Sequence, residues 1–257
     1  MKLGIYTCCS RTLPFEERIR VISETGFNTI SFDFTDTYLD TVMTHSDQVD
    51  IANKYGLEIQ ATHLSGDKMT TIWSECDDAE FVTQRLINEL ADLKDLGLKT
   101  GIAHVTWGYS DPGPVSQSAL NRFLRIAEAA EHYQVRVALE NSVYAELVHF
   151  LLDHIHSDYV GFCYDSGHEN AFAPNEKYLE RYGDRLFAMH LHDNYGEKDE
   201  HNIPFNGTVN WNEKMALLRK TKYFEEFGLT LELGCGEGDF RQYMEKAYEA
   251  ANKLMAL

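Results

Sequence analysis

Side chains able to bind a metal ion or move a proton recur at one kind of position in this sequence. Each lies at or near the end of a short apolar segment rich in β-branched or aromatic residues. Several carboxylates buried together cost several kcal/mol each unless a cation or hydrogen bonds compensate their charge. A divalent metal ion supplies this compensation, so we expect a metal centre among His63, His104, Glu140, Asp165, His190 and Glu232.

The types of ligand narrow the choice of metal. A set of carboxylates with imidazole suits Mn²⁺, Co²⁺, Zn²⁺ or Mg²⁺ better than an ion that prefers thiolates. The 5 cysteines form no CxxC pair, and an odd number scattered through a long chain indicates reduced thiols. Cys8 and Cys9 would point to opposite faces of a strand, so they are not assigned to a metal site.

These candidate ligands must be positioned by strands, and the sequence predicts eight of them. Short apolar runs alternate with longer segments of helical periodicity, which is typical of a parallel sheet with crossover helices. Eight strands in a chain of about 250 residues predict a closed (β/α)8 barrel of the α/β class, formed as one domain by residues 1–257. The expected strands are Leu3–Thr7, Thr29–Phe34, Glu58–His63, Thr100–Thr106, Arg136–Glu140, Val160–Asp165, Leu186–His192 and Leu229–Leu233.

The connections between the strands fit this arrangement. Segments 81–96 and 119–133 have the apolar spacing of amphipathic helices. Gly26, Gly56 and Gly97 stand where a helix should end in a left-handed residue. The longest irregular segments, 65–76, 108–115 and 194–210, all follow strands. They therefore belong to the carboxyl-terminal rim, where barrel enzymes carry their chemistry.

The overall charge argues against some classes of partner. With 41 acidic and 23 basic residues, the chain has a net charge of -18, which repels nucleic acid and anionic membranes. We find no secretory signal near the amino terminus and no apolar run of roughly 18 residues that would span a bilayer. The sequence therefore predicts a soluble cytoplasmic protein with no nucleic-acid or membrane partner.

Four short sequence runs, found in the same order as in a known family, together form a specific resemblance to that family. Together they are similar to the sugar phosphate isomerase/epimerase family, within the xylose isomerase-like barrel superfamily that also contains the endonuclease IV type of DNA repair enzyme. The similarity extends from the first expected strand to the last helix. The runs are Ala138–Asn141, Tyr164–His168, Met189–Asp193 and Leu231–Gly234.

The resemblance implies a role for each matching residue. Carried over to this chain, the family's metal ligands are Glu140, Asp165, His190 and Glu232, and His168 contacts a substrate hydroxyl. It implies isomerisation or epimerisation of a small sugar, a ketose or an inositol-like polyol through an enediolate. Glu140 and Glu232 would remove and return the proton. In the alternative, both only hold the metal while water or a histidine moves the proton.

A second set of residues resembles the nuclease branch. Asp199 and His201 match a segment that helps bind an additional zinc there, together with a histidine equivalent to His168. His63 and His104 match further zinc ligands of that branch. Where the family usually has Pro-Gly-Glu-Gly, this chain has Pro-Phe-Asn-Gly at 204–207, which leaves the local turn open.

We also expect particular residues to contact the substrate. His63, His104 and His168 would face it, and the rings of Tyr6 and Trp107 would stack on the apolar faces of a sugar. The glycine-rich loop 234–238 would suit a phosphate, but Glu237 and Asp239 oppose one, so an unphosphorylated substrate is favoured.

Two other functions stay open at the level of sequence. An endonuclease IV-like DNA repair nuclease would need basic residues on the rim, where the chain offers chiefly Arg11, Lys68 and Lys198. A sugar-binding barrel without turnover would use the same residues. The resemblance also leaves a homo-oligomer open, because such barrels often form dimers or tetramers. His192 is expected to face the helical layer, away from His190.

Overall fold

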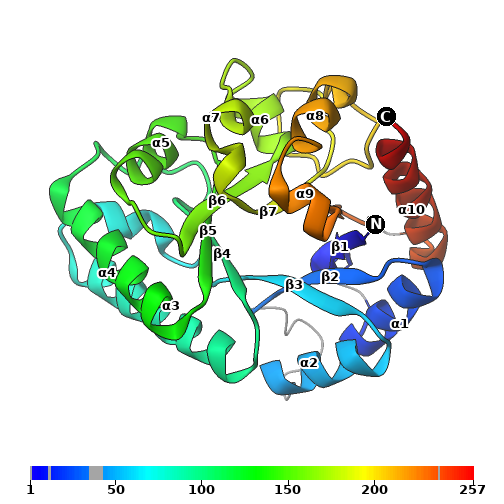
Figure 1. Ribbon diagram of the computed structural model, residues 1–257, viewed down its shortest axis with the longest axis horizontal. Helices are drawn as coiled ribbons and strands as arrows, with labels where there is room; N and C mark the ends of the chain where they lie inside the picture. The colour runs from blue at the N-terminus through cyan, green and yellow to red at the C-terminus, as the bar shows by residue number, and fades with distance from the viewer. Residues whose placement is uncertain (1, 11–12, 35–42, 237) are drawn as a thin grey trace.

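Parallel strands form the centre of the molecule, and helices surround them (Figure 1). The computed structural model describes residues 2–10, 13–34, 43–236 and 238–257. Within these residues the sheet has eight strands in the order β7-β6-β5-β4-β3-β2-β1-β8. They are β1 (Leu3–Tyr6), β2 (Thr29–Asp33), β3 (Glu58–His63), β4 (Thr100–His104), β5 (Arg136–Glu140), β6 (Val160–Asp165), β7 (Leu186–His190) and β8 (Leu229–Leu231).

The sheet closes into a barrel because β7 and β8, the strands at the two ends of this order, also lie side by side. Just beyond β7, the Leu191 amide donates to the Thr230 carbonyl at 3.0 Å, and the Glu232 amide donates to the Leu191 carbonyl at 3.1 Å. These bonds join β7 to β8 and complete the (β/α)8 barrel that the sequence predicts. Several strands end earlier than expected. For example, β7 ends at His190 because the His192 amide donates to the Ser166 hydroxyl and leaves the ladder.

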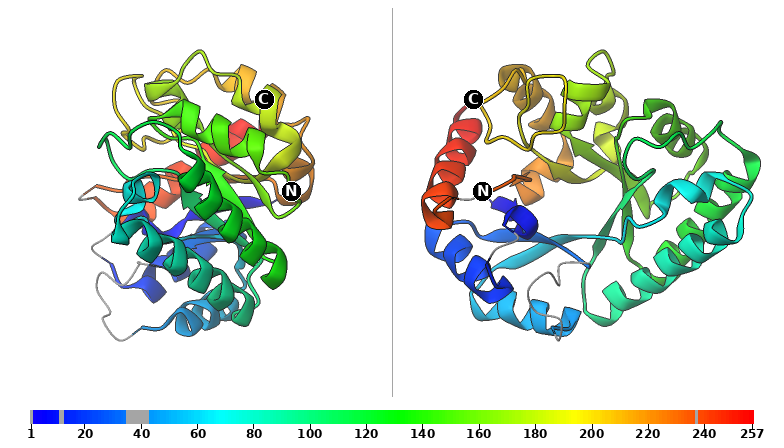
Figure 2. Two further views of the ribbon diagram at one scale, coloured as in Figure 1. Left: turned by 90° about the vertical axis from the view of Figure 1, so that its left-hand side faces the viewer. Right: turned by 180° about the vertical axis from the view of Figure 1, so that it is seen from behind.

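Helices follow the strands along the chain and enclose the barrel, as the view from behind also shows (Figure 2). β1 and α1 lie beside α10, so the two ends of the described chain meet at one side of the barrel (Figures 1 and 2). The helices are α1 (Phe15–Thr25), α2 (His45–Lys54), α3 (Asp77–Asp95), α4 (Gln117–Tyr133), α5 (Ala145–His154), α6 (Ser166–Phe172), α7 (Tyr178–Tyr182), α8 (Trp211–Leu218), α9 (Lys222–Phe227) and α10 (Phe240–Ala256), with short 3-10 turns η1 (Thr7–Cys9), η2 (Met69–Trp73) and η3 (Gly183–Arg185).

Left-handed residues end three of the early helices at the expected glycines. Gly26, Gly56 and Gly97 have φ values of 115°, 69° and 75°. α4 ends in the same way without a glycine, because Gln134 adopts φ 56°. The predicted helix starts were late by a few residues. α4 begins at Gln117 because the Ser116 hydroxyl accepts a hydrogen bond from the Ala119 amide and caps the first turn.

A layer of buried side chains, all but one of them small, lies below the carboxyl-terminal end of the barrel. Its members each lie two residues before a candidate ligand on the same strand, so both side chains point to one face. Small side chains in this layer leave room for larger polar groups above them. The layer consists of Ala61, Ile102, Ala138, Cys163 and Ala188, which precede His63, His104, Glu140, Asp165 and His190.

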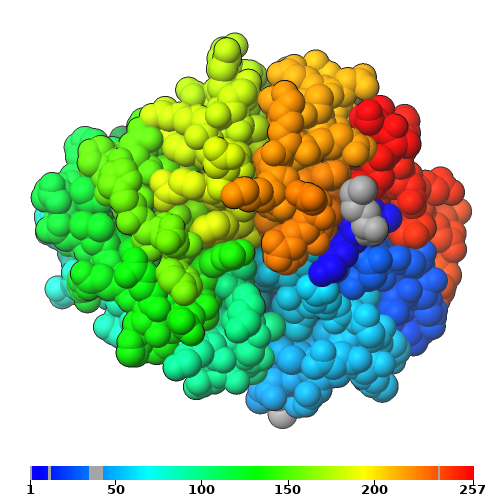
Figure 3. All heavy atoms as spheres, in the orientation of Figure 1, coloured from blue at the N-terminus to red at the C-terminus, as the bar shows by residue number. Residues whose placement is uncertain are grey.

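Side chains close the middle of the face seen in Figure 1, as the space-filling view shows (Figure 3). The cavity described below is lined by residues at the ends of strands, among them Asp33, His63 and His104. No helix in the described ranges is both long and apolar enough to cross a lipid bilayer.

Candidate metal centre

Four side chains from neighbouring strands converge at the carboxyl-terminal end of the barrel. Glu140, Asp165 and His190 are the last residues of β5, β6 and β7, and Glu232 follows β8 directly. One ligand atom from each lies within 4.8 Å of the others. The four residues are 0–8% exposed, so their charges are removed from bulk water. The four residues that the resemblance singles out thus meet in one place.

His190 lies between two of these carboxylates. Its Nδ1 is 2.7 Å from Glu140 Oε1 and 3.2 Å from Glu232 Oε2. Burial lowers the pKa of His190, but the two glutamates outweigh it and raise that pKa above its ordinary value. Burial likewise raises the pKa of Glu140, yet the surrounding histidines hold it well below its usual range. The imidazole and its neighbouring carboxylates therefore shift each other's pKa in opposite directions.

Asp165 is oriented by its own neighbours. Asn141 forms two hydrogen bonds of 2.8 Å with the backbone of Asp165, one to its carbonyl and one from its amide. The Asp165 carboxylate caps α6, because its Oδ1 accepts from the His168 amide at 2.7 Å. Burial raises the pKa of Asp165, but His168 and His192 outweigh burial and lower it. The carboxylate is therefore held ionised at the first turn of α6.

His63 and His104 cover the other side of Glu140. Their Nε2 atoms lie 3.4 Å and 3.2 Å from Glu140 Oε2, and their rings lie 4.4 Å apart. Burial lowers the pKa of His63, but Glu140 raises it more strongly, to about 9. Burial, together with the nearby His63, lowers the pKa of His104 to about 3. The pKa values of these two neighbouring imidazoles, whose planes are tilted by 33°, are thus shifted in opposite directions.

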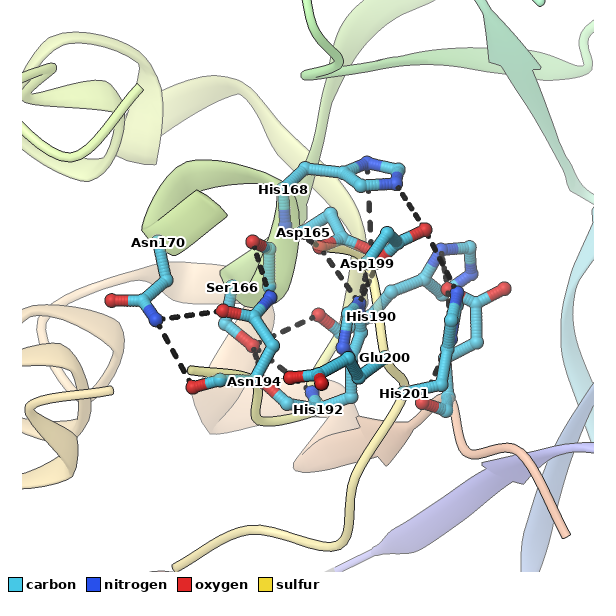
Figure 4. A network of polar contacts seen from close by, with 12 residues as sticks. Asp165, Ser166, His168, Asn170, His190, His192, Asn194, Asp199, Glu200 and His201 are labelled. Atoms are coloured by element: carbon cyan, nitrogen blue, oxygen red, sulfur yellow. Dashed lines mark hydrogen bonds and ion pairs between the residues drawn. The ribbon is translucent and has the colours of Figure 1, made fainter. Parts of the chain in front are cut away.

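A second polar cluster surrounds Asp199 in the segment after β7 (Figure 4). Asp199 Oδ2 lies 3.0 Å from His201 Nε2 and 3.2 Å from His168 Nε2. Burial raises the pKa of Asp199, but these histidines lower it below its ordinary value. Burial lowers the pKa of His201, but Asp199 raises it, to about 9. Asp199 and His201 are therefore brought together as the resemblance implies.

His192 belongs to this polar region, and the prediction that it faces the helical layer is wrong. Its Nε2 lies 3.1 Å from Asp165 Oδ1 and 3.5 Å from Asp199 Oδ1, and its side chain is fully buried. Side chains two residues apart on an extended chain point to the same face, so His192 follows His190 toward the barrel opening. The two-residue spacing between His190 and His192 is the sequence signal that could have identified His192 as a residue of this site.

The segment that carries Asp199 is anchored by a buried carboxylate. Asp193 accepts hydrogen bonds from the amides of Asn194, Val209 and Phe205 and from Trp211 Nε1. A Cβ at Gly207 would lie 2.2 Å from Asp193 Oδ1, so this position requires glycine. Phe205, which replaces a family glycine, adopts a left-handed φ of 75°. The altered sequence therefore keeps a turn of glycine-like shape.

The site opens into a cavity of about 940 Å³. Glu140, Asp165 and His190 lie beneath its lining, whereas Glu232 forms part of its wall. Among the described residues that line it there is no lysine or arginine. Arg11 and Glu237 lie outside the described residues. The expected site residues on the wall are Tyr6, His63, His104, Trp107, His168, Asp199, His201 and Glu232.

The two predicted aromatic contacts differ in exposure. Trp107 is 53% exposed and rests against Gly66, where a Cβ would lie 2.2 Å from the indole. Tyr6 is 8% exposed and donates its hydroxyl proton to Asp33 Oδ2 at 2.8 Å. Asp33, a cavity residue that the sequence analysis missed, ends β2 in the way that the candidate ligands end their strands. Strand position alone could have identified it.

The donor set of the first group fits a divalent metal. Three carboxylates and one imidazole meet within bonding reach of a common point, and hard oxygen with borderline nitrogen donors suits Mn²⁺, Co²⁺, Zn²⁺ or Mg²⁺. Glu140 Oε2 is buried, and although His63 Nε2 and His104 Nε2 lie 3.4 Å and 3.2 Å from it, no group in the described part of the chain gives it a contact with hydrogen-bond geometry. A buried carboxylate oxygen without a donor is a group that a cation would satisfy.

Comparison with known proteins agrees with this architecture. Protein y4fM of Sinorhizobium fredii is 42% identical over 96 residues, which are 35% of this chain and 31% of that protein. MJ1311 of Methanocaldococcus jannaschii is 28% identical over 109 residues, 38% of this chain and 37% of that protein. The chain thus matches only about a third of the length of either relative.

Solved structures resemble the whole chain. A D-tagatose 3-epimerase-like protein has a TM-score of 0.76 at 16% identity and covers 100% of this chain and 98% of its own. The IOLI protein with a bound zinc atom has a TM-score of 0.74 at 18% identity, with coverage of 100% and 97%. D-psicose 3-epimerase of Clostridium cellulolyticum H10 has a TM-score of 0.77 at 13% identity, with 99% of each chain covered.

At such low sequence identities, this structural likeness shows the fold alone. A family model described as the xylose isomerase-like TIM barrel matches residues 19–255, which is most of the chain. The protein belongs to the xylose isomerase-like TIM barrel family.

Proposed function

We propose that this protein is a divalent-metal-dependent isomerase or epimerase acting on a small sugar, ketose or inositol-like polyol. The observation that carries the proposal is that Glu140 and Glu232 flank His190 Nδ1 at the base of a cavity of about 940 Å³. This volume is in the range of small-molecule sites. Sugar epimerases among the structures of similar fold support the choice of substrate class.

In this proposal Glu140, Asp165, His190 and Glu232 hold the metal ion. When bound, the ion would supply Lewis-acid stabilisation of the negative charge that develops on an enediolate. The residues themselves set the site's shape: Asn141 holds Asp165 by two hydrogen bonds, and β8 places Glu232 on the cavity wall.

Glu232 and Glu140 are our candidates for moving the proton. Glu232 reaches the cavity directly, whereas Glu140 is 1% exposed and lies behind His63 and His104. Glu232 is therefore better placed to take a proton from a substrate carbon. Glu140 could return a proton to the substrate carbon only if the substrate reached past His63 and His104. If Glu140 solely holds the metal, the two glutamates will differ in their effect on turnover.

The cavity wall supports an unphosphorylated substrate. Its described residues include Asp33, Asp67, Asp199, Glu200 and Glu232 and no lysine or arginine, so a phosphate dianion would meet repulsion. His63, His104 and His168 would donate or accept hydrogen bonds with hydroxyl groups. Trp107 presents an exposed ring for stacking on a sugar, and Tyr6 lies deeper beside Asp33.

The proposal is tested by proton exchange. Metal-loaded protein is incubated with a panel of ketoses and keto-polyols in heavy water, and deuterium at carbon is followed by NMR. We expect exchange and a new isomer, with Glu140→Gln and Glu232→Gln each losing about 10²–10⁴-fold in rate. Glu128→Gln, at an exposed position of α4 outside the cavity lining, serves as the matched control. Full activity after metal removal would contradict the proposal.

The same experiments separate the other functions. Sugar binding without exchange would indicate a binding barrel, and incision of an abasic-site duplex would indicate a nuclease. Lys68, one of the few rim bases, is already paired with Asp78 at 3.0 Å, which supports the view that nucleic acid is not the substrate. We further propose a cytoplasmic protein without a membrane partner, and light scattering would test for a homo-oligomer.

A further inference from the structure

We infer that the outer part of the cavity binds a second sugar ring, so that the substrate is a ketose or keto-polyol joined to a further neutral sugar. This inference rests on the proposed function, because the reacting ring would lie at the site assigned to the metal. The outer ring would stack on Tyr109 and Phe172, two cavity residues to which the proposed reaction gives no role. The substrate class is thereby narrowed to disaccharide-like compounds.

The size of the cavity is the first reason. Small-molecule sites have volumes of about 300–1,000 Å³ and bury most of the surface of a drug-sized ligand. The cavity of about 940 Å³ lies near the upper end of that range, whereas a single hexose is much smaller than a drug-sized ligand. A single sugar bound at Glu232 and Trp107 would therefore leave much of the cavity to solvent.

Trp107 lies where the reacting ring would end. Its ring centroid is 5.0 Å from that of His104, whose Nε2 is 3.2 Å from Glu140 Oε2. The Thr70 hydroxyl accepts from the Trp107 amide at 2.9 Å and donates to the Trp107 carbonyl at 3.0 Å, and the indole rests on Gly66. The exposed indole is therefore held in place beside the site assigned to the metal.

Tyr109 and Phe172 form a second aromatic surface on the cavity wall. Tyr109 is 67% exposed, and its ring meets that of Phe172 edge to face with centroids 5.8 Å apart. The Tyr109 carbonyl accepts from the Tyr144 hydroxyl at 3.1 Å, which holds the backbone at this position. The Phe172 ring lies 5.9 Å from the ring of His168, which contacts Asp199 (Figure 4). The second surface therefore continues inward to the polar cluster around Asp199.

The spacing of the two aromatic surfaces suits adjacent sugar rings. Tyr109 follows Trp107 by two residues, and two residues of chain span at most about 7 Å. Neighbouring rings of a disaccharide are spaced on the same scale. Gly108, which separates the two aromatic residues, has a left-handed φ of 65°, and all three residues line the cavity. Because aromatic rings stack on the apolar faces of sugars, one chain segment would offer a platform to each ring.

Carboxylates on the same wall favour a sugar over an apolar group at the outer position. Asp67 follows Gly66, on which Trp107 rests, and Glu200 belongs to the segment after β7. Both acidic residues are exposed and line the cavity. Ionised carboxylates accept hydrogen bonds from hydroxyl groups, which an apolar ring does not offer. The described wall has no lysine or arginine, so a uronate or a sugar phosphate would be repelled. The outer ring is therefore a neutral sugar.

Paired substrates test the inference. Metal-loaded protein is incubated in heavy water with D-fructose, or with maltulose or lactulose, in which a second sugar is joined to the fructose unit by an α or a β linkage. Deuterium at carbon is followed by NMR. We expect kcat/KM for one of the two-ring sugars to exceed that for D-fructose by about tenfold or more, because two aromatic contacts are added. Tyr109→Ala and Phe172→Leu should each reduce this preference about 3- to 10-fold.

A matched control and a binding measurement accompany the exchange assay. Tyr195→Ala, at a 63% exposed tyrosine that does not line the cavity, should leave the preference for two-ring sugars unchanged. Calorimetry with the same sugars reports binding without turnover. The two-ring sugar should bind more tightly than D-fructose in the parent protein and in Tyr195→Ala, and the difference should shrink in Tyr109→Ala.

The outcomes separate the inference from the proposed function. Exchange and binding of D-fructose at least as good as those of both two-ring sugars would overturn the outer ring position and leave the proposed function standing. No exchange with any sugar, with the binding preference intact, would overturn the proposed turnover and support the outer ring position. Tighter binding of phenyl β-D-glucoside than of maltulose and lactulose would assign the outer position to an apolar ring and overturn the inference.

Discussion

The side chain of Asn141 is joined to the backbone of Asp165 by two hydrogen bonds of 2.8 Å. Asn141 follows β5, and Asp165 ends β6, so this pair connects the ends of two strands that carry candidate ligands. An amide that bonds both the N–H and the C=O of one residue fixes that residue's position closely. The relationship makes Asn141 a positioning residue for Asp165.

Asn141→Ala should therefore weaken metal binding without removing a ligand. Loss of an outer-sphere hydrogen bond typically costs about 10–100-fold in metal affinity. The buried backbone groups of Asp165 would also lose their partners, at about 1–3 kcal/mol of stability. Competition with a chelator of known affinity measures the first effect, and urea unfolding the second. Asn53→Ala, on the exposed surface of α2, should change neither; unchanged metal affinity in Asn141→Ala would refute the role.

Lys214→Met should destabilise the protein strongly. Lys214 Nζ lies 2.8 Å from Glu169 Oε2, whose side chain is 3% exposed, and Tyr164 donates to the same oxygen at 2.5 Å. Removing the lysine leaves a buried carboxylate without its cation, which costs about 3–5 kcal/mol. Chemical denaturation measures the change. Lys220→Met, two residues past the end of α8 and exposed, is the control and should stay within about 0.5 kcal/mol of the parent.

The effect of Lys214→Met should depend on pH in a defined direction. Burial raises the pKa of Glu169, and Lys214 lowers it, so the variant's pKa should be higher than the parent's. An acid whose folded pKa exceeds its unfolded pKa reduces stability as pH rises from the unfolded value to the folded one. The loss should be largest above the folded pKa and smaller near pH 5. An equal loss at pH 5 and pH 8 would show that charge on Glu169 is not the cause.

Gly207→Ala should disrupt the segment between β7 and α8. Its Cβ would lie 2.2 Å from Asp193 Oδ1, the carboxylate that holds this segment through amides of Phe205 and Val209. We expect a loss of at least about 2 kcal/mol and faster proteolysis within residues 194–210. Gly236→Ala, where nothing lies within 4 Å of an added Cβ, is the comparison. Equal stability of the two variants would show that Asp193 does not anchor the segment.

The cysteines should react with alkylating reagents in a fixed order. Burial raises the pKa of Cys9 to about 12, so at pH 8 roughly one thiol in 10⁴ is ionised, and the thiol is also shielded. Cys163 is fully buried with a raised pKa, whereas Cys76 is exposed. Labelling of the folded protein with iodoacetamide, followed by mass spectrometry, should modify Cys76 first. Labelling of Cys9 at the rate of Cys76 would contradict the prediction.

Strand periodicity explains why the candidate ligands were recognisable before any coordinates. Glu140, Asp165 and His190 each stand two residues after a small buried side chain, and all three end their strands. Parallel strands that end on one rim must bring these ends together once the barrel closes. The same reasoning, applied consistently, would also have placed His192 on the inner face and added Asp33 at the end of β2.

Residue types, strand count and charge are properties of the chain itself, and they were enough to specify a barrel with a carboxylate-rich rim. Which atoms lie within bonding distance depends on contacts between residues far apart in sequence. The pairing of His192 with Asp199 depends on Gly167 leaving room for a ring and on Asp193 fixing the segment up to Val209. Such contacts depend on packing in three dimensions, which local sequence patterns do not encode.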